Sequence, residues 1–386
     1  MRIRNALKQC SVNISLLVLT TVICFWVSEG VSRLLLDPGD YLAPQLLPDE
    51  ILKWRIEPHS AGHDAWGFRN RSVPDTADIV VVGDSQTYGI NASAQNSWPM
   101  ILGRLMNKNV YNMALGGFCP VQYYYLIITS AIQLNPSFVI VGFYFGNDLS
   151  GTYHMIHEYP YWNYLSKTNQ LKSEITSSYI QDRKLVEDKL PFHLKLRKWL
   201  SQNSIIYRLF TYNLAENFRH LETKYFHSAD EAIVFLDDNE NNIHTAFKPE
   251  IRYNAMNLED VTIREGLEVS LELFAEMNAF CKENGIDFVV VLIPTKESVF
   301  SRYIEDKILL PHSDLLNQVM KNERKIKEII SDYFTSNYIR YIDVLQPLRN
   351  SIPAVKCYPS NWDGHPNKYG YEIIASTVKQ YLESIE

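Results

Sequence analysis

Cysteine and clustered positive charge are both scarce in this sequence, which excludes two common kinds of site. The 386 residues include only five cysteines, and no spacing among them resembles a zinc site. There is no long run of lysine and arginine, and the formal net charge is −7. A nucleic-acid backbone is bound mainly through clustered positive charge, so nucleic acid is not expected as a partner. We predict no metal site and no cofactor.

The few cysteines differ in their surroundings. Cys10 and Cys24 lie in or beside an apolar N-terminal run, and Cys281 falls in a helical pattern where we expect a buried free thiol. Cys119 and Cys357 lie on two loops that we expect to converge, so a disulfide between them is conceivable. Three cysteines outside the N-terminal run cannot all pair with one another.

The N-terminus lacks charge over the nineteen residues Cys10–Ser28, which follow Arg2, Arg4 and Lys8. A helix of about 20 such residues spans a bilayer, and the flanking positive charge keeps that end in the cytoplasm. No small-x-small cleavage site precedes Glu29, so we favour an uncleaved anchor, with a cleaved signal peptide as the alternative. Residues 1–36 would form the cytoplasmic tip and anchor. The rest would lie outside the cytoplasm, periplasmic or extracellular.

Short apolar runs that alternate with helical patterns organise the chain after residue 77. Five runs have the length and β-branched content of buried parallel strands, at 79–82, 110–114, 138–145, 286–293 and 339–344. Helical patterns follow them, at 97–107, 120–134, 259–284, 313–334 and from 369 to the end. Strands that alternate with helices predict an α/β fold, a three-layer α/β/α sandwich around a parallel five-stranded sheet.

Two segments do not show this alternation of strand and helix patterns. Residues 37–77 hold several prolines and little periodicity, which is typical of a linker or an edge segment. Residues 150–257 begin with an aromatic part, continue through an amphipathic helical stretch at about 192–222 and then become polar. We therefore expect one domain over 78–386, with a mainly helical insertion at 150–257 that caps the carboxyl edge of the sheet.

Polar residues and glycines follow three successive strands. Ser85 comes directly after the first strand, Gly117 after the second and Asn147 after the third. Ligands of open α/β sheets bind at the carboxyl ends of the strands, so we expect these three residues to lie close together. Each of them could instead serve only its own turn, as a helix cap or as a residue with positive φ.

Asp363 and His365 lie in the loop that follows the fifth strand. In an extended loop the side chains at positions i and i+2 point the same way. The carboxylate could then contact one ring nitrogen and leave the other free to take a proton from Ser85. Taken alone, this spacing favours a surface loop in which Asp-Gly forms a turn and Pro-Asn caps the following helix.

Four sequence blocks, in this order along the chain, resemble those of the SGNH (GDSL-type) hydrolase superfamily. They are Gly83-Asp-Ser85, Asn112-Met-Ala-Leu-Gly-Gly117, Gly146-Asn-Asp148 and Asp363-Gly-His365. The resemblance implies a flavodoxin-like fold in which Ser85 is the nucleophile, His365 the general base and Asp363 the acid. It also implies an oxyanion hole formed by the amides of Ser85 and Gly117 and the side chain of Asn147. Many members space the acid and base as Asp-x-x-His, and the shorter Asp-x-His resembles membrane-anchored members and periplasmic enzymes that O-acetylate alginate and related polysaccharides.

The chemistry implied by the resemblance is acyl transfer through an acyl-serine intermediate. We expect an esterase or O-acyltransferase that acts on acyl groups, such as acetyl, of a carbohydrate or on a small ester. A membrane-bound acyltransferase is a candidate partner. A non-catalytic glycan-binding component of a polysaccharide assembly complex and a lipid-directed esterase remain as alternatives.

Three aromatic residues of the insertion, Tyr159, Tyr161 and Trp162, come a few residues after Asn147. Their position predicts that they leave the sheet at the rim of the site, where aromatic rings can stack on sugars. The alternative is that they pack the insertion onto the sheet. The sequence leaves both interpretations open.

Overall fold

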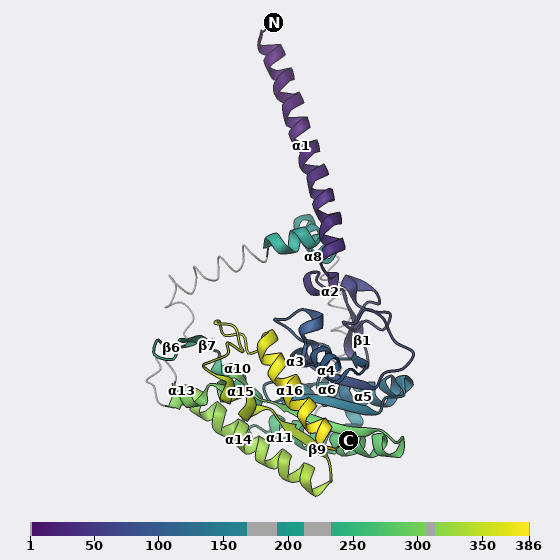
Figure 1. Cartoon of the computed structure of the whole chain (residues 1–386), viewed down its shortest axis with the longest axis vertical. Helices are drawn as coiled ribbons and strands as arrows, with labels where there is room; N and C mark the ends of the chain where they lie inside the picture. Colours follow the sequence, from purple (N-terminus) through teal and green to yellow (C-terminus); the bar gives the residue numbers. More distant parts are fainter. Residues whose placement is uncertain (1, 168–190, 212–232, 306–312, 386) are drawn as a thin grey trace. The chain divides into compact units, whose positions relative to one another are not determined.

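The computed structural model describes residues 2–167, 191–211, 233–305 and 313–385 (Figure 1). These residues form two compact units. The smaller unit contains residues 2–45, 60–62 and 191–211, and the larger unit contains the others. Part of the segment that we expected to cap the sheet, 191–211, is thus grouped with the N-terminal helix. The predicted helical stretch beyond residue 211 lies outside the described residues.

The smaller unit is built on a long apolar helix, α1 (Arg2–Leu35). Its segment Gln9–Leu35 has a mean hydropathy of 2.1 and is long and apolar enough to cross a membrane. Such a helix near the N-terminus fits either a membrane anchor or a signal sequence. Glu29 on this helix accepts a hydrogen bond of 2.9 Å from Ser204 Oγ, which links α1 to the chain after α8 (Phe192–Asn203). The unit also contains α2 (Pro38–Tyr41) and η1 (Ser60–Gly62).

The larger unit contains a parallel sheet of five strands. In the order of pairing they are β4 (Val110–Asn112), β3 (Ile79–Gly83), β5 (Phe138–Tyr144), β8 (Asp287–Ile293) and β9 (Arg340–Asp343). All four neighbouring pairs run parallel. These strands are the five apolar runs of the sequence, because β-branched residues suit a strand that is covered on both faces. The predicted α/β fold with a parallel five-stranded sheet is therefore confirmed.

The sheet separates two apolar clusters. In β3, Val80 and Val82 belong to one cluster, whereas Ile79 and Val81 belong to the other, because successive side chains point to opposite faces. Side chains of three helices contribute to the first cluster: α5 (Pro120–Thr129), α6 (Asp148–Glu158) and α11 (Val261–Glu283). The second cluster includes side chains of α4 (Trp98–Met106) and α16 (Lys368–Ile385). Helices on both faces complete the three-layer sandwich.

The remaining helices of this unit are short, apart from α14. They are α3 (Ser85–Tyr88), η2 (Ala94–Asn96), η3 (Ala131–Leu134), η4 (Pro160–Leu165), α10 (Pro249–Met256), α12 (Lys296–Val299), α13 (Ser301–Glu305), α14 (Ser313–Ser336) and α15 (Leu345–Ser351).

The strand order places the first strand of the sheet, β3, between β4 and β5. The chain crosses to one side of β3 to form β4 and then to the other side to form β5. In doubly wound sheets the loops that leave the strands at such a reversal diverge, and the crevice between them is where ligands bind. The turns after β3, β4 and β5 therefore meet at a topological switch point.

Two antiparallel hairpins were not predicted from the sequence. The segment expected to be a linker contains β1 (Leu46–Asp49) and β2 (Lys53–Ile56), and the insertion contains β6 (Val234–Asp238) and β7 (Ile243–Phe247). The insertion is thus not helical throughout. Its polar stretch is a hairpin turn, in which Asp238 accepts a hydrogen bond of 3.1 Å from the amide of Glu240 and Asn242 has a φ of 53°. Asx turns and left-handed asparagine are typical of such connections.

Candidate active site

Ser85 is the first residue of α3, directly after β3. Asp84 caps this short helix, because its Oδ1 accepts a hydrogen bond of 2.8 Å from the amide of Gln86. Thr87 packs against the end of the strand so closely that a Cβ on Gly83 would lie 2.3 Å from Thr87 Oγ1. Only glycine fits there. The turn thus presents Ser85 at the carboxyl end of a central strand.

His365 links Ser85 to Asp363. Its Nε2 lies 2.8 Å from Ser85 Oγ, and its Nδ1 lies 2.6 Å from Asp363 Oδ1. The backbone amide of His365 also donates to Asp363 Oδ1 at 2.9 Å. In a neutral imidazole, Nδ1–H donates to the carboxylate and Nε2 accepts from the hydroxyl. The contact expected from the i, i+2 spacing is therefore present, together with a second one through the backbone.

The carboxylate of Asp363 is held in its ionised form. Burial raises the pKa of this group, but the hydrogen bonds and charge of His365, with a further hydrogen bond from Asn91, outweigh burial and lower the pKa to about 2. A carboxylate that is ionised at neutral pH keeps the proton of the imidazole on Nδ1. Nε2 is then free to accept the hydroxyl proton of Ser85.

Gly117 and Asn147 lie beside the serine, as their places after β4 and β5 predicted. A Cβ on the neighbouring Gly116 would be 3.7 Å from Ser85 Cβ, and Gly117 has a φ of 78°, which favours glycine. The amides of Ser85 and Gly117 donate no hydrogen bond to any residue that the structure describes. They are free to bind an oxygen anion near the serine.

Asp84 connects the nucleophile to Asn147. Its Oδ2 accepts a hydrogen bond of 3.0 Å from Asn147 Nδ2 and lies 3.3 Å from Ser85 Oγ. Burial raises the pKa of Asp84, whereas the hydrogen bond from the amide of Gln86 and the charge of His365 lower it. Because Ser85 Oγ is closer to the imidazole than to this carboxylate, the chief role of Asp84 is to orient the turn and the side-chain amide of Asn147.

The aromatic residues of the insertion are mostly packed. Trp162 is 1% exposed and donates a hydrogen bond of 2.7 Å from Nε1 to the carbonyl of Ile51, and Tyr159 is buried as well. Buried rings cannot stack on a sugar, so the sugar-platform hypothesis does not fit Tyr159 and Trp162. Tyr161, at 51% exposed, is the one of the three that presents a ring to solvent.

The thiols take no part in the site. All five cysteines are free, and Cys119 and Cys357 belong to the clusters on opposite faces of the sheet, so they do not form a disulfide. Cys281 is a buried free thiol, as predicted. Within the described ranges, no group of three or more histidine, cysteine and acidic side chains could hold a metal ion.

Several supporting residues had no signal in the sequence. Trp54 of β2 donates a hydrogen bond of 3.3 Å to the carbonyl of Gly116, and its ring would lie 2.8 Å from a Cβ on Gly117. Arg252 of α10 donates to the carbonyl of Gly146 at 3.2 Å. Gln86 Nε2 donates to the carbonyl of Gly364 at 3.3 Å. These contacts join segments that are far apart in the chain, so no local pattern indicates them.

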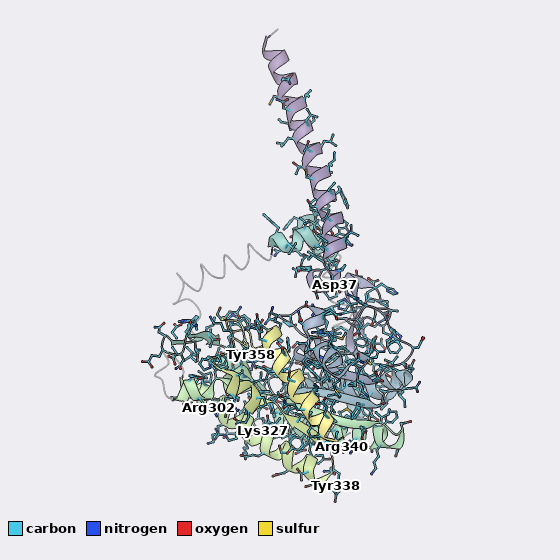
Figure 2. The ribbon with its side chains drawn as sticks, viewed as in Figure 1. Asp37, Arg302, Lys327, Tyr338, Arg340 and Tyr358 are labelled. Carbon is cyan, nitrogen blue, oxygen red and sulfur yellow. The ribbon has the colours of Figure 1, made fainter. Side chains whose placement is uncertain are left out.

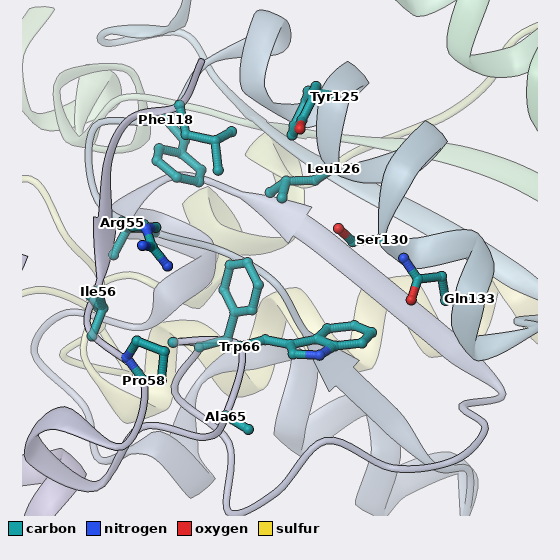
Figure 3. A pocket seen from close by; sticks show the side chains of 14 residues that line it. Arg55, Ile56, Pro58, Ala65, Trp66, Phe118, Tyr125, Leu126, Ser130 and Gln133 are labelled. Carbon is teal, nitrogen blue, oxygen red and sulfur yellow. The ribbon is translucent and has the colours of Figure 1, made fainter. Parts of the chain in front are cut away.

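A pocket of about 310 Å³ lies in the same unit (Figure 3). Aromatic side chains, including Trp66 and Tyr125, line it together with polar groups such as Arg55 and Gln133. It shares the turn from Leu115 to Phe118 with the candidate site, but Ser85, Asp363 and His365 do not line it.

No family model and no curated protein matches the chain. Among solved structures it is similar to phospholipase A1 from Streptomyces albidoflavus, with 12% identity, a TM-score of 0.41 and coverage of 80% of this chain and 99% of that chain. It is also similar to an acetylxylan esterase from Geobacillus stearothermophilus, with 8% identity, a TM-score of 0.38 and coverage of 80% and 94%. A GDSL-like lipase from Bacteroides thetaiotaomicron has 11% identity, a TM-score of 0.36 and coverage of 80% and 88%. At these identities and TM-scores the likeness carries no argument about function, which rests on the geometry of the site.

Proposed function

We propose that this chain is a serine-dependent acyl-ester hydrolase of the SGNH (GDSL) type. The observation that carries the proposal is the pair of contacts made by His365, 2.8 Å to Ser85 Oγ and 2.6 Å to Asp363 Oδ1. A serine, a histidine and a carboxylate in this order form the machinery of nucleophilic acyl transfer, whatever the fold that presents them. The amides of Ser85 and Gly117 beside the serine support the same chemistry.

The reaction proceeds in two half-reactions. His365 Nε2 takes the hydroxyl proton while Ser85 Oγ attacks the ester carbonyl, and Asp363 stabilises the imidazolium that forms. The amides of Ser85 and Gly117 and the side chain of Asn147 bind the oxyanion, where each such donor contributes about 3 kcal/mol. The imidazolium then protonates the leaving alcohol, and an acyl-serine remains. Water, or a sugar hydroxyl in a transferase, gives its proton to His365 and attacks the acyl group. His365 then returns that proton to Ser85 Oγ as the bond between the serine and the acyl group breaks.

The substrate that we propose is an acyl group, such as acetyl, on a carbohydrate outside the cytoplasm. The short Asp363-x-His365 spacing and the apolar helix α1 support this proposal. If the second half-reaction is transfer, a membrane-bound acyltransferase that supplies the acyl group would be the partner. Incubation of the full chain with an acetylated oligosaccharide, or with phospholipid vesicles, separates this substrate from a lipid. Release from the lipid alone would contradict the carbohydrate proposal.

The nucleophile is tested by Ser85→Ala, with Ser360→Ala as the control from an exposed position in the loop that carries His365. We expect Ser85→Ala to abolish hydrolysis of 4-nitrophenyl acetate with an unchanged circular dichroism spectrum, and Ser360→Ala to behave like the wild type. A fluorophosphonate probe should label Ser85 and no other serine. Activity of Ser85→Ala within a few-fold of the wild type would refute the proposed function.

A further inference from the structure

Lys296 is a buried lysine directly under the loop that carries Asp363 and His365. It is the first residue of α12, after β8, and is 1% exposed. Its Nζ donates hydrogen bonds to three backbone carbonyls, those of Pro359 at 2.9 Å, Asn361 at 2.7 Å and Asp363 at 3.4 Å. One ammonium group therefore uses all three of its protons on alternate residues of a single loop.

The partners of this lysine are unusual for a buried cation. Lys296 forms no ion pair with a carboxylate among the described residues. The ring of Phe247 lies 5.7 Å from its Nζ, and the ring of Tyr358, which is labelled in Figure 2, lies 5.9 Å from it. Burial lowers the pKa of Lys296 to about 7, although the charges of Glu297 and Asp363 oppose that shift. A buried charge is costly unless hydrogen bonds compensate it, and here backbone carbonyls provide the compensation.

The loop depends on such contacts for its conformation. Residues 359–363 belong to no helix or strand, so their carbonyls lack the hydrogen bonds that regular structure would supply. When three alternate carbonyls point to one atom, the backbone curls around that atom. This curl sets the direction in which Asp363 and His365 leave the loop.

The residue before Lys296 is anchored to helix α14. The preceding residue, Thr295, caps α12, and its amide donates a hydrogen bond of 3.3 Å to Glu323 Oε1 on α14. The hydroxyl of Thr295 also donates to Glu323. Contacts therefore run without a gap from α14 through Lys296 to the loop, and from there through His365 to Ser85.

We propose that Lys296 is a positioning residue, which holds the loop 359–363 so that Asp363 orients His365 toward Ser85. The proposal rests on the proposed function of the site. Lys296 acts through the loop and touches neither the serine nor the imidazole. Misplacement of a catalytic group by about 1 Å typically costs about 10²-fold in rate.

The test compares Lys296→Met with the wild type in the full-length protein. The variant keeps an unbranched side chain, one atom shorter, and removes the three donors. We expect kcat for 4-nitrophenyl acetate to fall about 10²-fold with KM unchanged, and fluorophosphonate labelling of Ser85 to slow by the same factor. Lys296→Arg, which keeps a cationic donor, should recover part of the rate. Lys327→Met is the matched control, because the hydrogen bond of 2.9 Å from Lys327 (Figure 2) goes to Asp343 and not to the loop 359–363, so its loss should leave the rate unchanged.

A folded Lys296→Met variant that labels Ser85 within three-fold of the wild-type rate would overturn the proposal. If Lys296→Met does not fold, Lys296→Gln retains two amide protons and is measured in the same way. Slower labelling at unchanged KM supports the proposal, and a wild-type rate overturns it. Ser85→Ala distinguishes a failure of the proposed function from a failure of the positioning role of Lys296. If Ser85→Ala stays active, the proposed function fails, whereas an inactive Ser85→Ala beside a fully active Lys296→Met refutes the positioning role alone.

Discussion

The turn that carries Ser85 and the loop that carries His365 reach the same site by different means. The turn is built locally: it continues a central strand, and Asp84 caps it through a bond to Gln86, two residues away. The loop is held from a distance, because Lys296 bonds to residues 63 and 65 positions further along the chain. Gln86 reaches the carbonyl of Gly364 across 278 positions. The position of the nucleophile thus depends on the backbone around it, and the position of the base depends on tertiary contacts.

This difference predicts where substitutions act. Changes to the groups that react should lower the rate far more than they lower stability. Changes to packed residues that hold no reacting group in place, such as Trp162, should lower stability first. The following substitutions test that division, from the largest expected loss of rate to the smallest.

Asp363→Asn should keep the shape of the loop and lower kcat by roughly 10⁴-fold, because an amide no longer fixes the tautomer of His365 or stabilises its cation. The measurement is kcat for a small activated ester beside the melting temperature. A loss below ten-fold would mean that another group orients His365.

The effect of Asp363→Asn on the free energy of unfolding should also depend on pH. The folded-state pKa of Asp363, about 2, lies below its usual value of 3.8, so the carboxylate contributes stability above pH 3.8 and loses it as the pH falls toward 2. The difference in free energy of unfolding between wild type and Asp363→Asn should shrink over that range. A constant difference from pH 7 down to pH 2 would contradict the assignment.

Asn147→Ala should lower kcat by about 10²–10³-fold, as expected when one oxyanion donor is removed. KM for a small ester should change little, because the contact strengthens only as charge develops on the oxygen. Asn147 also bonds to Asp84 at 3.0 Å, so the circular dichroism spectrum and the melting temperature provide the control. A change in KM alone would show that Asn147 binds substrate and does not stabilise the transition state.

Trp162→Ala should have the smallest effect on the rate and the largest effect on stability. Loss of a buried tryptophan costs about 3–5 kcal/mol of the free energy of unfolding, and well below the melting temperature kcat for a small ester should stay at the wild-type value. Tyr161→Ala is the comparison, because its ring is 51% exposed and loses only edge contacts with Tyr125 and Trp162, so its removal should cost much less stability. If Trp162→Ala instead weakened turnover of an acylated polysaccharide without destabilising the protein, its ring would belong to the binding surface.

The sequence by itself determined the sheet and the residues of the candidate site. Each buried parallel strand leaves a continuous apolar run, and Ser85, Gly117 and Asn147 follow directly after three such runs. Asp363 and His365 were recognisable because their contact spans only two residues. The spacing alone also fits plain turns, and the order of the four sequence blocks along the chain favoured the candidate site.

Tertiary structure alone decided what surrounds these residues. Trp54 lies against the turn of Gly117, although its segment was expected to be a linker. Lys296 follows directly after a strand and holds the loop of His365. Trp162 is buried, although its segment was expected to cap the sheet. The hairpins β1–β2 and β6–β7 were equally hidden. Trp54, Lys296 and Trp162 each contact a partner that is 62, 63 and 111 residues away, respectively. The free energy of such a contact comes from burial and hydrogen bonding between distant segments, and a pattern along one segment does not contain the identity of its partner.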